Sequence, residues 1–294
     1  METEIKKVIL PIAGLGTRFL PLSKIMPKEI WPLVDKPIIQ ALIEEARASG
    51  IKQAIFVTND RKNLILDYLK SSPSLKRILQ TRKKDQILEE LESIEKINKD
   101  MNFSSVTQDK PLGDGHAILQ AVSKVKKEAV GVMFGDDIVD SEIPCLQQLI
   151  NIFKTCQRPV VALHRLPKEK LSAYGVPKLE KIANRVFKIK KITEKPAIGE
   201  EPSDLAIVGK YILTPDVFDY LKTAKPNKNG EIVLADTFDR MLREGKTIYG
   251  YEFEGKWLEC GSKVNWLKSN IYFSLKDPRF KEELKNFIKE NNLF

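Results

Sequence analysis

Apolar segments of strand and helix character alternate over the first seventy residues of this chain. Val8–Leu10 with Ile12 has the β-branching and length of a buried strand, and residues 38–46 carry apolar side chains at helical spacing before a glycine stop. A second strand pattern at Ala54–Val57 and a second helical pattern at Leu64–Leu69 follow. This alternation predicts an α/β fold with a doubly wound, mostly parallel, Rossmann-like sheet, whose ligands bind at the carboxyl ends of the strands.

The first predicted strand runs into a glycine-rich, cationic loop that extends to residue 37. Its start, AGLGTR at residues 13–18, is small enough for the backbone to turn tightly against a ligand and to present N–H groups to phosphates or a base. Arg18, Lys24 and Lys28 add positive charge, and four prolines oppose helix formation. We therefore expect a stiff anion-binding loop over the sheet.

Two well-known phosphate motifs do not fit this loop. A Walker A loop needs a second Gly followed by Lys and Ser/Thr, and a dinucleotide fingerprint needs a third Gly where this chain has Phe19. The order G-x-G-T-R-x-x-P-x-S-K, then P-K-E and D-K-P, instead resembles the signature of the sugar-phosphate nucleotidyltransferases. Its AGLGTR form is similar to the bacterial UTP–glucose-1-phosphate uridylyltransferases of that family. A glycine turn before a solvated basic loop explains Gly14 and Gly16, but not the order of Arg, Lys and Pro.

A second glycine loop follows the strand predicted at residues 103–107. It runs from Gln108 to G-D-G-H-A at residues 113–117, just before a predicted helix, so backbone donors lie where an anion or base could bind. A simple turn at a helix start is the alternative. The family carries Gln and then G-x-G-H-A at this place, and the resemblance implies that Gln108 and Gly113 contact the base. Leu112 and Asp114 stand where the family often has Lys and Leu, so the resemblance does not define the fine shape of the base pocket.

Two adjacent carboxylates follow the apolar strand predicted at residues 129–134. Asp136 and Asp137 would repel each other unless a cation or solvent separates them. Hard oxygen ligands of this kind suit Mg²⁺, which takes one or two carboxylates and fills its shell with phosphates and water. A capping pair in a solvated turn is the alternative. We expect Mg²⁺ as the cofactor and Asp136 as its ligand.

Short strands with polar ends are predicted in the second half of the chain. The segments at 173–176, 192–196 and 205–211 look like the family's A-Y-G-V, E-K-P and A-I-V-G-x-Y segments, which form its sugar-binding half. Each is weak alone, since a Glu-Lys pair is usually a surface ion pair. Residues 257–263 resemble the family's D-C-G-x-K with Glu259 in place of the usual Asp, so the resemblance covers about residues 5–270.

A chain of 294 residues is long enough to bury one large hydrophobic core. We expect a single nucleotidyltransferase domain over residues 1–294, with a nucleotide-binding half (5–140), a sugar-binding half (141–265) and a C-terminal helical tail (266–294). Residues 76–100 predict a charged helical insertion packed on the rim of the domain. Residues 277–294 predict an amphipathic helix, for core packing or for subunit contact. The resemblance implies a homo-oligomer, a dimer or a tetramer.

Composition limits the kinds of partner. The net charge of +9 favours an anionic partner. The basic residues are, however, scattered among 40 acidic ones, so we expect no nucleic-acid partner. No apolar run approaches the roughly 18 residues of a membrane span and the start is no signal peptide, so we expect a soluble cytoplasmic protein without a membrane partner. Three cysteines without CxxC spacing indicate neither a disulfide framework nor a zinc site.

The polar residues suit a reaction without a protein nucleophile. The chain has only two histidines, and no Ser, Cys or Thr has the context of an activated nucleophile. A sugar phosphate is largely a dianion at pH 7 and can attack an α-phosphorus directly, so the protein needs only to align and neutralise two anions. The resemblance implies that UTP and glucose 1-phosphate give UDP-glucose and pyrophosphate. The alternatives are another base or sugar, such as dTTP, and a non-catalytic nucleotide-sugar-binding regulator.

The resemblance also implies roles at the matching positions. The expected catalytic residues are Arg18, Lys28, Asp136 and Lys195. The expected nucleotide-binding residues are Ala13, Gly14, Gly16, Thr17, Gln108 and Gly113. The expected sugar-binding residues are Asp137, Gly175, Glu194 and Gly209.

Overall fold

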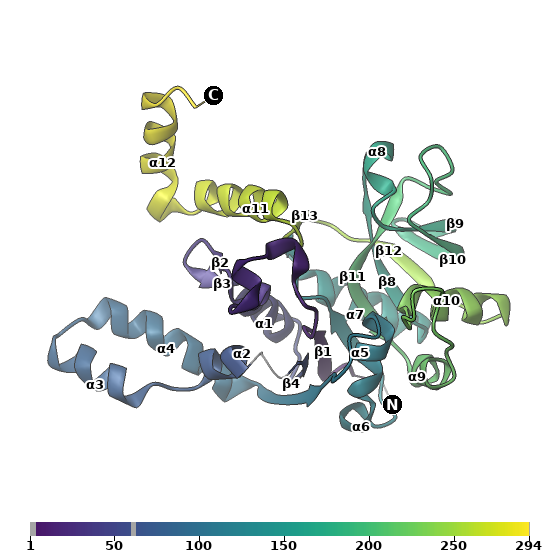
Figure 1. The fold of residues 1–294 in the computed structure, drawn as a ribbon, viewed down its shortest axis with the longest axis horizontal. Coiled ribbons are helices and arrows are strands. Elements are labelled where there is room, and N and C mark those ends of the chain that lie inside the picture. The colour runs from purple at the N-terminus through teal and green to yellow at the C-terminus, as the bar shows by residue number, and fades with distance from the viewer. Residues whose placement is uncertain (1–3, 60–62, 294) are drawn as a thin grey trace.

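The apolar runs of the chain assemble into one nine-stranded sheet with the order β5-β4-β1-β6-β11-β8-β12-β10-β9 (Figure 1). The structure is a computed structural model that describes residues 4–59 and 63–293. The strands of this sheet are β1 (Lys7–Pro11), β4 (Gln53–Thr58), β5 (Asn102–Thr107), β6 (Val130–Met133), β8 (Val160–Arg165), β9 (Gly175–Ala183), β10 (Val186–Glu194), β11 (Leu205–Leu213) and β12 (Tyr249–Glu252). Two small sheets pair β2 (Pro32–Leu33) with β3 (Lys36–Pro37) and β7 (Asp137–Asp140) with β13 (Lys256–Glu259).

The direction of the strands confirms the predicted doubly wound, mostly parallel sheet. β5, β4, β1 and β6 are mutually parallel neighbours, and β8 and β12 run the same way. Among the described strands of this sheet, β10 and β11 run against the others. The parallel half of the sheet therefore brings the carboxyl ends of β1, β4, β5 and β6 to one edge.

Helices cover both faces of the sheet and bury two large cores. The N-terminal helices are α1 (Ile38–Ala48), α2 (Asn63–Leu69), α3 (Pro73–Thr81), α4 (Asp85–Asp100), α5 (Asp114–Gln120) and α6 (Val122–Val125). The later ones are α7 (Cys145–Cys156), α8 (Lys168–Leu171), α9 (Pro215–Lys222), α10 (Leu234–Arg243), α11 (Lys263–Lys276) and α12 (Pro278–Glu290).

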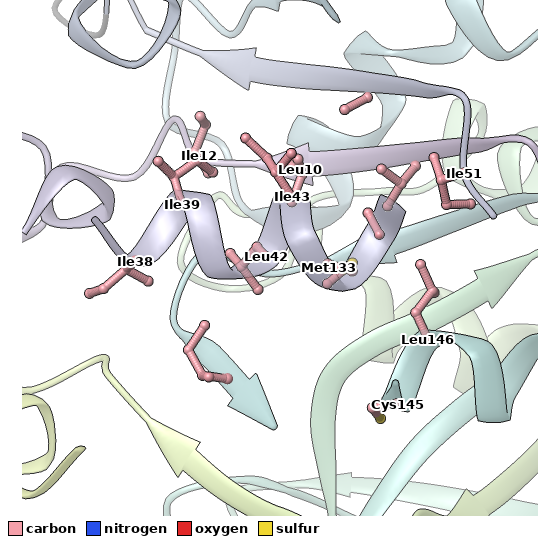
Figure 2. Close-up of a cluster of buried hydrophobic side chains, with 14 of the residues drawn as sticks. Leu10, Ile12, Ile38, Ile39, Leu42, Ile43, Ile51, Met133, Cys145 and Leu146 are labelled. Carbon is pink, nitrogen blue, oxygen red and sulfur yellow. The ribbon is translucent and has the colours of Figure 1, made fainter. Parts of the chain in front are cut away.

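The two cores lie on opposite faces because side chains alternate along each strand. Leu10 of β1 belongs to the core under α1 and α7, whereas its neighbour Ile9 belongs to the core under α5, α9 and α10. Figure 2 shows Ile39, Leu42 and Ile43 of α1 gathered with Leu10 in the first core. The strand periodicity of the sequence thus encodes a sheet that is buried on both sides.

The charged insertion is two helices rather than one element packed on the rim. α3 and α4 form a hairpin that projects from the body (Figure 1). The run Arg82-Lys83-Lys84 interrupts the apolar stripe, and Lys83 adopts φ 52°, which ends a helix. No residue of α3 is buried, so the predicted packing of the insertion on the domain is wrong for this helix.

The strands of the second half are longer than predicted. β9, β10 and β11 have nine residues each, and β9 and β10 form an antiparallel hairpin. Polar side chains fill the exposed face of this hairpin and hide the strand pattern in the sequence. The predicted division into halves and tail stays a prediction.

The C-terminal tail is helical, as predicted, with α12 preceded by α11. All three cysteines are free, as expected. No helix in the described ranges combines the length and apolar character needed to cross a membrane.

Candidate functional site

The first glycine loop and Gln108 lie at the carboxyl edge of the parallel strands. Ile12 donates to the carbonyl of Val57 at 2.9 Å, and the backbone N–H of Gln108 donates to the carbonyl of Thr58 at 2.8 Å. Asn59, which follows β4, donates its side-chain amide to the carbonyl of Ala13 at 2.8 Å. The loops after three neighbouring strands are therefore linked at one edge, as expected for a ligand site of such a sheet.

Two glycines of the first loop serve different purposes. Gly16 is left-handed with φ 64°, and a Cβ there would lie 3.2 Å from Ser23 Cβ. A Cβ at Gly14 would meet nothing within 4 Å, so the protein itself does not require glycine at this exposed position. The space beside Gly14 is open, and a small cavity of 20 Å³ lies between this loop and Lys28. Thr17 starts a short 3₁₀ turn that carries Arg18.

The loop is anchored by aromatic side chains that the sequence did not identify as part of the site. Phe19 packs edge-on against Trp31 at 4.6 Å between ring centroids, and Trp31 packs against Trp266 of α11 at 5.0 Å. Lys263 donates to the carbonyl of Leu20 at 2.8 Å, and the Trp266 indole donates to a loop carbonyl. The C-terminal helix α11 therefore stiffens the cationic loop.

The structure brings Arg18, Lys28 and Asp136 together, and their predicted catalytic roles stay predictions. The Lys28 ammonium donates to Asp136 Oδ2 in a close ion pair, with side chains 17% and 24% exposed. Burial would lower the pKa of Lys28, but the carboxylates of Asp136 and Glu29 outweigh it and raise that pKa. Burial would raise the pKa of Asp136, but Lys28 and then Arg18 lower it. Both groups of the pair therefore stay charged.

Asp137 faces into the protein. Its Oδ1 accepts from the Trp257 indole at 2.7 Å, and its Oδ2 accepts from the backbone N–H of Gly209 at 3.0 Å. A Cβ at Gly209 would collide with Asp137 Oδ2, so glycine is required by this contact. Burial and the neighbouring Asp136 raise the pKa of Asp137 to about 7. In the structure Asp137 and Gly209 thus hold β7, β11 and β13 together, and the predicted sugar contact of these two residues stays a prediction.

Glu259 reaches the same space as Asp136. A Cβ added at Gly261 would lie 2.6 Å from Glu259 Oε1 and 2.7 Å from Asp136 Oδ2, so the two carboxylates converge beside this glycine. Asn265 donates to the other oxygen of Glu259 and orients it. No group of three or more His, Cys, Asp or Glu side chains in the described residues could hold a metal. Two carboxylates, completed by phosphate oxygens and water, nevertheless fit Mg²⁺.

Gly175, Glu194 and Lys195 lie together at one end of the β9–β10 pair, and their predicted contacts with the sugar phosphate stay predictions. Gly175 pairs with Glu194 across β9 and β10, and a Cβ at Gly175 would lie 3.1 Å from Glu194 Oε2. β10 ends at Glu194, as the following proline predicted, and Lys195 takes φ 46°, which is uncommon for a residue with a side chain. The Lys195 ammonium lies 3.7 Å from Glu194 Oε1, and both side chains are exposed.

The second glycine loop is held by the segment before α10. Gly113 has φ 100°, and a Cβ there would lie 2.5 Å from the carbonyl oxygen of Ile232. Asp114 Oδ1 accepts from the backbone N–H groups of Gly115 at 2.6 Å and Leu234 at 3.0 Å. Gly115 lies inside α5 rather than before it. Glycine at position 113 is therefore explained by the fold, and its predicted contact with a base stays a prediction.

Asp114 is expected to make stability depend on pH. Burial raises its pKa to about 6, against the two backbone donors. Because this value exceeds that of the unfolded chain, the folded state binds more protons between about pH 4 and pH 6, and stability should fall as the pH rises through this window. Asp114→Asn keeps the acceptor, so it should raise the free energy of unfolding at pH 7 by about 1–3 kcal/mol.

Chemical unfolding at pH 4.5 and pH 7 measures this effect. The exposed residue Asp109 provides a control, since Asp109→Asn should leave the pH dependence of stability as in the parent protein. If the free energy of unfolding changes equally between pH 4.5 and pH 7 in the Asp114→Asn variant and in the parent, Asp114 is not the cause of the pH dependence.

Known proteins share these features. A family model described as nucleotidyl transferase matches residues 6–272. A Staphylococcus haemolyticus protein named UTP–glucose-1-phosphate uridylyltransferase is 41% identical, with 98% of each chain covered. A solved structure of UTP-bound UGPase from Acinetobacter baumannii matches with a TM-score of 0.89 at 33% identity, covering 98% of this chain and 99% of that one. A UDP-glucose pyrophosphorylase complexed with UDP-glucose matches with a TM-score of 0.85 at 36% identity, covering 93% and 100%.

Proposed function

The chain belongs to the nucleotidyl transferase family, and we propose that it makes UDP-glucose and pyrophosphate from UTP and glucose 1-phosphate. The observation that carries this proposal is the meeting of Arg18, Lys28 and Asp136 at the strand edge, in a chain that full-length uridylyltransferase relatives match. The names of these relatives specify UTP, so the dTTP alternative is not favoured. An enzyme is favoured over a regulator for the same reason.

The proposed reaction is a direct displacement at phosphorus. A phosphate oxygen of glucose 1-phosphate bonds to the α-phosphorus of UTP, and the bond from this phosphorus to the oxygen that bridges to the β-phosphorus breaks. Pyrophosphate leaves with that oxygen. Arg18 and Lys28 neutralise the triphosphate, Lys195 binds the sugar phosphate, and Glu194 accepts from sugar hydroxyls. Ala13, Gly14, Gly16 and Thr17 carry the nucleotide on the loop.

We also propose Mg²⁺ as the cofactor, held by Asp136 with Glu259 beside it. The support is the convergence of their oxygens next to Gly261 and the charged state of Asp136. When bound, the ion would neutralise phosphate charge. Glu259 has one more methylene than the Asp of the family, and Asn265 holds it in place.

A substrate panel tests the function. Pyrophosphate release is measured with UTP, dTTP or CTP against glucose 1-phosphate and its galactose epimer, with and without Mg²⁺. We expect the highest kcat/KM for UTP with glucose 1-phosphate. A preference for dTTP, or no release with any pair, would contradict the proposal.

Arg18 is expected to act on the leaving group. Its guanidinium lies 3.5 Å from the carbonyl oxygen of Gly261, the glycine beside which Asp136 and Glu259 converge. With Lys28 it lowers the pKa of Asp136, so its charge acts at the place proposed for the triphosphate. Arg18→Ala should lower kcat by about tenfold to a hundredfold and change KM for glucose 1-phosphate less, because charge grows on pyrophosphate in the transition state. Steady-state kinetics measure these two effects. The matched control is Lys24→Ala, which removes another positive charge from the same loop. A change confined to KM for the sugar phosphate would assign Arg18 to the other substrate.

We further propose a homo-oligomer whose contact is the arm groove, the groove between the α3–α4 hairpin and helices α11–α12. It has a volume of 1190 Å³, and both arms project from the same end of the molecule (Figure 1). Leu75 and Ile87, which line it, are 43% and 50% exposed. α12 buries none of its residues although it carries an apolar stripe, and Phe287 on it is 55% exposed. We propose that the α12 stripe of a second copy packs in this groove, because burial there would remove these exposed apolar side chains from water.

Light scattering tests this contact. We expect the parent protein to exceed the mass of one chain and Phe287→Glu to shift it toward the monomer, because a carboxylate in an apolar contact costs desolvation energy. Lys289→Glu alters the exposed polar side of the same helix and should not shift it. A monomeric parent protein would contradict the proposal. The cytoplasmic location expected from the sequence stays a prediction.

A further inference from the structure

The side-chain amide of Gln108 contacts a backbone carbonyl and a histidine ring. The residue is 5% exposed, and its Nε2 lies 3.1 Å from the carbonyl oxygen of Gly113 and 2.9 Å from Nδ1 of His116. A carbonyl oxygen can only accept, so the amide atom that faces Gly113 is the nitrogen. The hydrogen bonds of this amide within the described residues all use Nε2. Its oxygen is therefore the atom left for a ligand.

The same contacts determine where the His116 ring carries its proton. Since Gln108 donates to Nδ1, a neutral ring has its proton on Nε2. On that side, Nε2 of Gln120 lies 3.1 Å from the ring nitrogen and 3.2 Å from the carbonyl oxygen of His116. Two amide nitrogens cannot both donate to a neutral imidazole. Each amide nitrogen also faces a carbonyl, that of Gly113 or that of His116, but Gln108 is buried whereas Gln120 is half-buried and can exchange its contacts for water. We therefore assign the acceptor role on the ring to Nδ1, which faces Gln108.

The backbone around His116 keeps the ring in place. His116 lies in the first turn of α5, and its N–H donates to the carbonyl of Ile232 at 3.3 Å. Ile232 in turn donates to the carbonyl of Leu112 at 2.7 Å. The ring thus contacts Gln108 from a segment held on both sides.

We infer that His116 is a positioning residue for nucleobase choice, which holds the Gln108 amide with its oxygen as the acceptor for a base that carries an imide N–H. This inference rests on the proposed function, in which Gln108 contacts the base. Uracil has such an N–H at position 3, whereas N3 of cytosine is an acceptor and would face a second acceptor. Turning the amide over would place its oxygen against the carbonyl of Gly113 and, in this tautomer, against Nδ1 of His116. Both contacts would then be repulsive, so Gln108 cannot adapt to cytosine at low cost.

Two variants that differ by one methylene test the inference. Asn at position 116 can place an amide oxygen near the former Nδ1 and accept from Gln108, whereas Gln places its amide near the former Nε2. We expect His116→Gln to lower the ratio of kcat/KM for UTP over CTP by about tenfold or more. His116→Asn should keep most of that ratio, and Gln120→Ala should leave it unchanged. CTP is also measured as a competitive inhibitor of UTP, so that slow turnover does not hide its binding.

The outcomes separate a positioning role from a structural one. Equal loss of activity with UTP and CTP in the His116→Gln variant, with the ratio retained, would overturn the inference. A reduced ratio in the Asn variant equal to that in the Gln variant would also overturn it. Absence of UTP turnover in the parent protein would instead refute the proposed function. Thermal unfolding and the inhibition constant for UTP report whether each variant folds and binds.

Discussion

Asp136→Asn is expected to remove most of the Mg²⁺-dependent turnover, lowering kcat by about 100- to 1000-fold. The carboxylate lies at the end of β6, keeps its charge beside Lys28 and Arg18, and shares a space with Glu259. Asn has a neutral oxygen at the same place, so the shape is kept and the charge is lost. Turnover measured over a range of Mg²⁺ concentrations should show a higher requirement for the ion as well as a lower plateau.

Two controls accompany this variant. Asp204→Asn makes the same chemical change at an exposed ion pair with Arg165 and should leave kcat unchanged. Thermal unfolding should show that Asp136→Asn is still folded, although it is less stable than the parent because the largely buried Lys28 loses its partner. A normal rate at saturating Mg²⁺ would exclude Asp136 as the principal ligand.

Local sequence patterns predicted the parallel half of the fold well. The strand at residues 7–11, the helix from Ile38 and the strand at residues 53–58 are all encoded by apolar periods of their own segments. The β9–β10 hairpin was predicted as short segments because one face of it is exposed and polar, and such strands carry a weak apolar signal. The two-helix arm was missed because apolar side chains recur on both sides of the short break at Lys83, so the sequence predicted a single helical segment.

Several contacts of the candidate site join residues that are far apart in the sequence. Trp266 stiffens the cationic loop from more than two hundred residues away, and no local pattern could reveal that contact. The same holds for Asp137, whose partners Gly209 and Trp257 come from two later strands or strand ends. The motif order placed Arg18, Lys28 and Asp136 correctly in one place, but the fold was needed to show which carboxylate faces inward.

Lys195→Ala is expected to lower kcat/KM for glucose 1-phosphate by about 30- to 1000-fold, which corresponds to about 2–4 kcal/mol of transition-state stabilisation. Lys195 is 63% exposed at the end of β10, and its one charged neighbour in a described ion pair is Glu194 at 3.7 Å. Such an exposed pair contributes little to stability, so the stability of the fold does not by itself account for a lysine at this position. A compact ammonium here can follow a phosphate as it approaches the α-phosphorus.

The backbone of Lys195 offers a sharper variant than alanine. With φ 46° the residue is left-handed, a conformation that costs a side-chain-bearing residue about 1–2 kcal/mol and costs glycine nothing comparable. Lys195→Gly should therefore be at least as stable as the parent protein while losing as much activity as Lys195→Ala. Thermal unfolding and kinetics with varied glucose 1-phosphate measure the two effects separately.

Lys191→Ala provides the matched control, because Lys191 is an exposed lysine of the same strand with extended backbone. It should keep normal kinetics. Glu194→Ala should weaken the preference for glucose 1-phosphate over its epimers while the KM for UTP stays near normal, since its carboxylate accepts from hydroxyls rather than binding phosphate. If both Lys195 variants retain the parent kcat/KM for glucose 1-phosphate, then Glu194 and Lys195 form only a surface ion pair, and the left-handed turn has no part in catalysis.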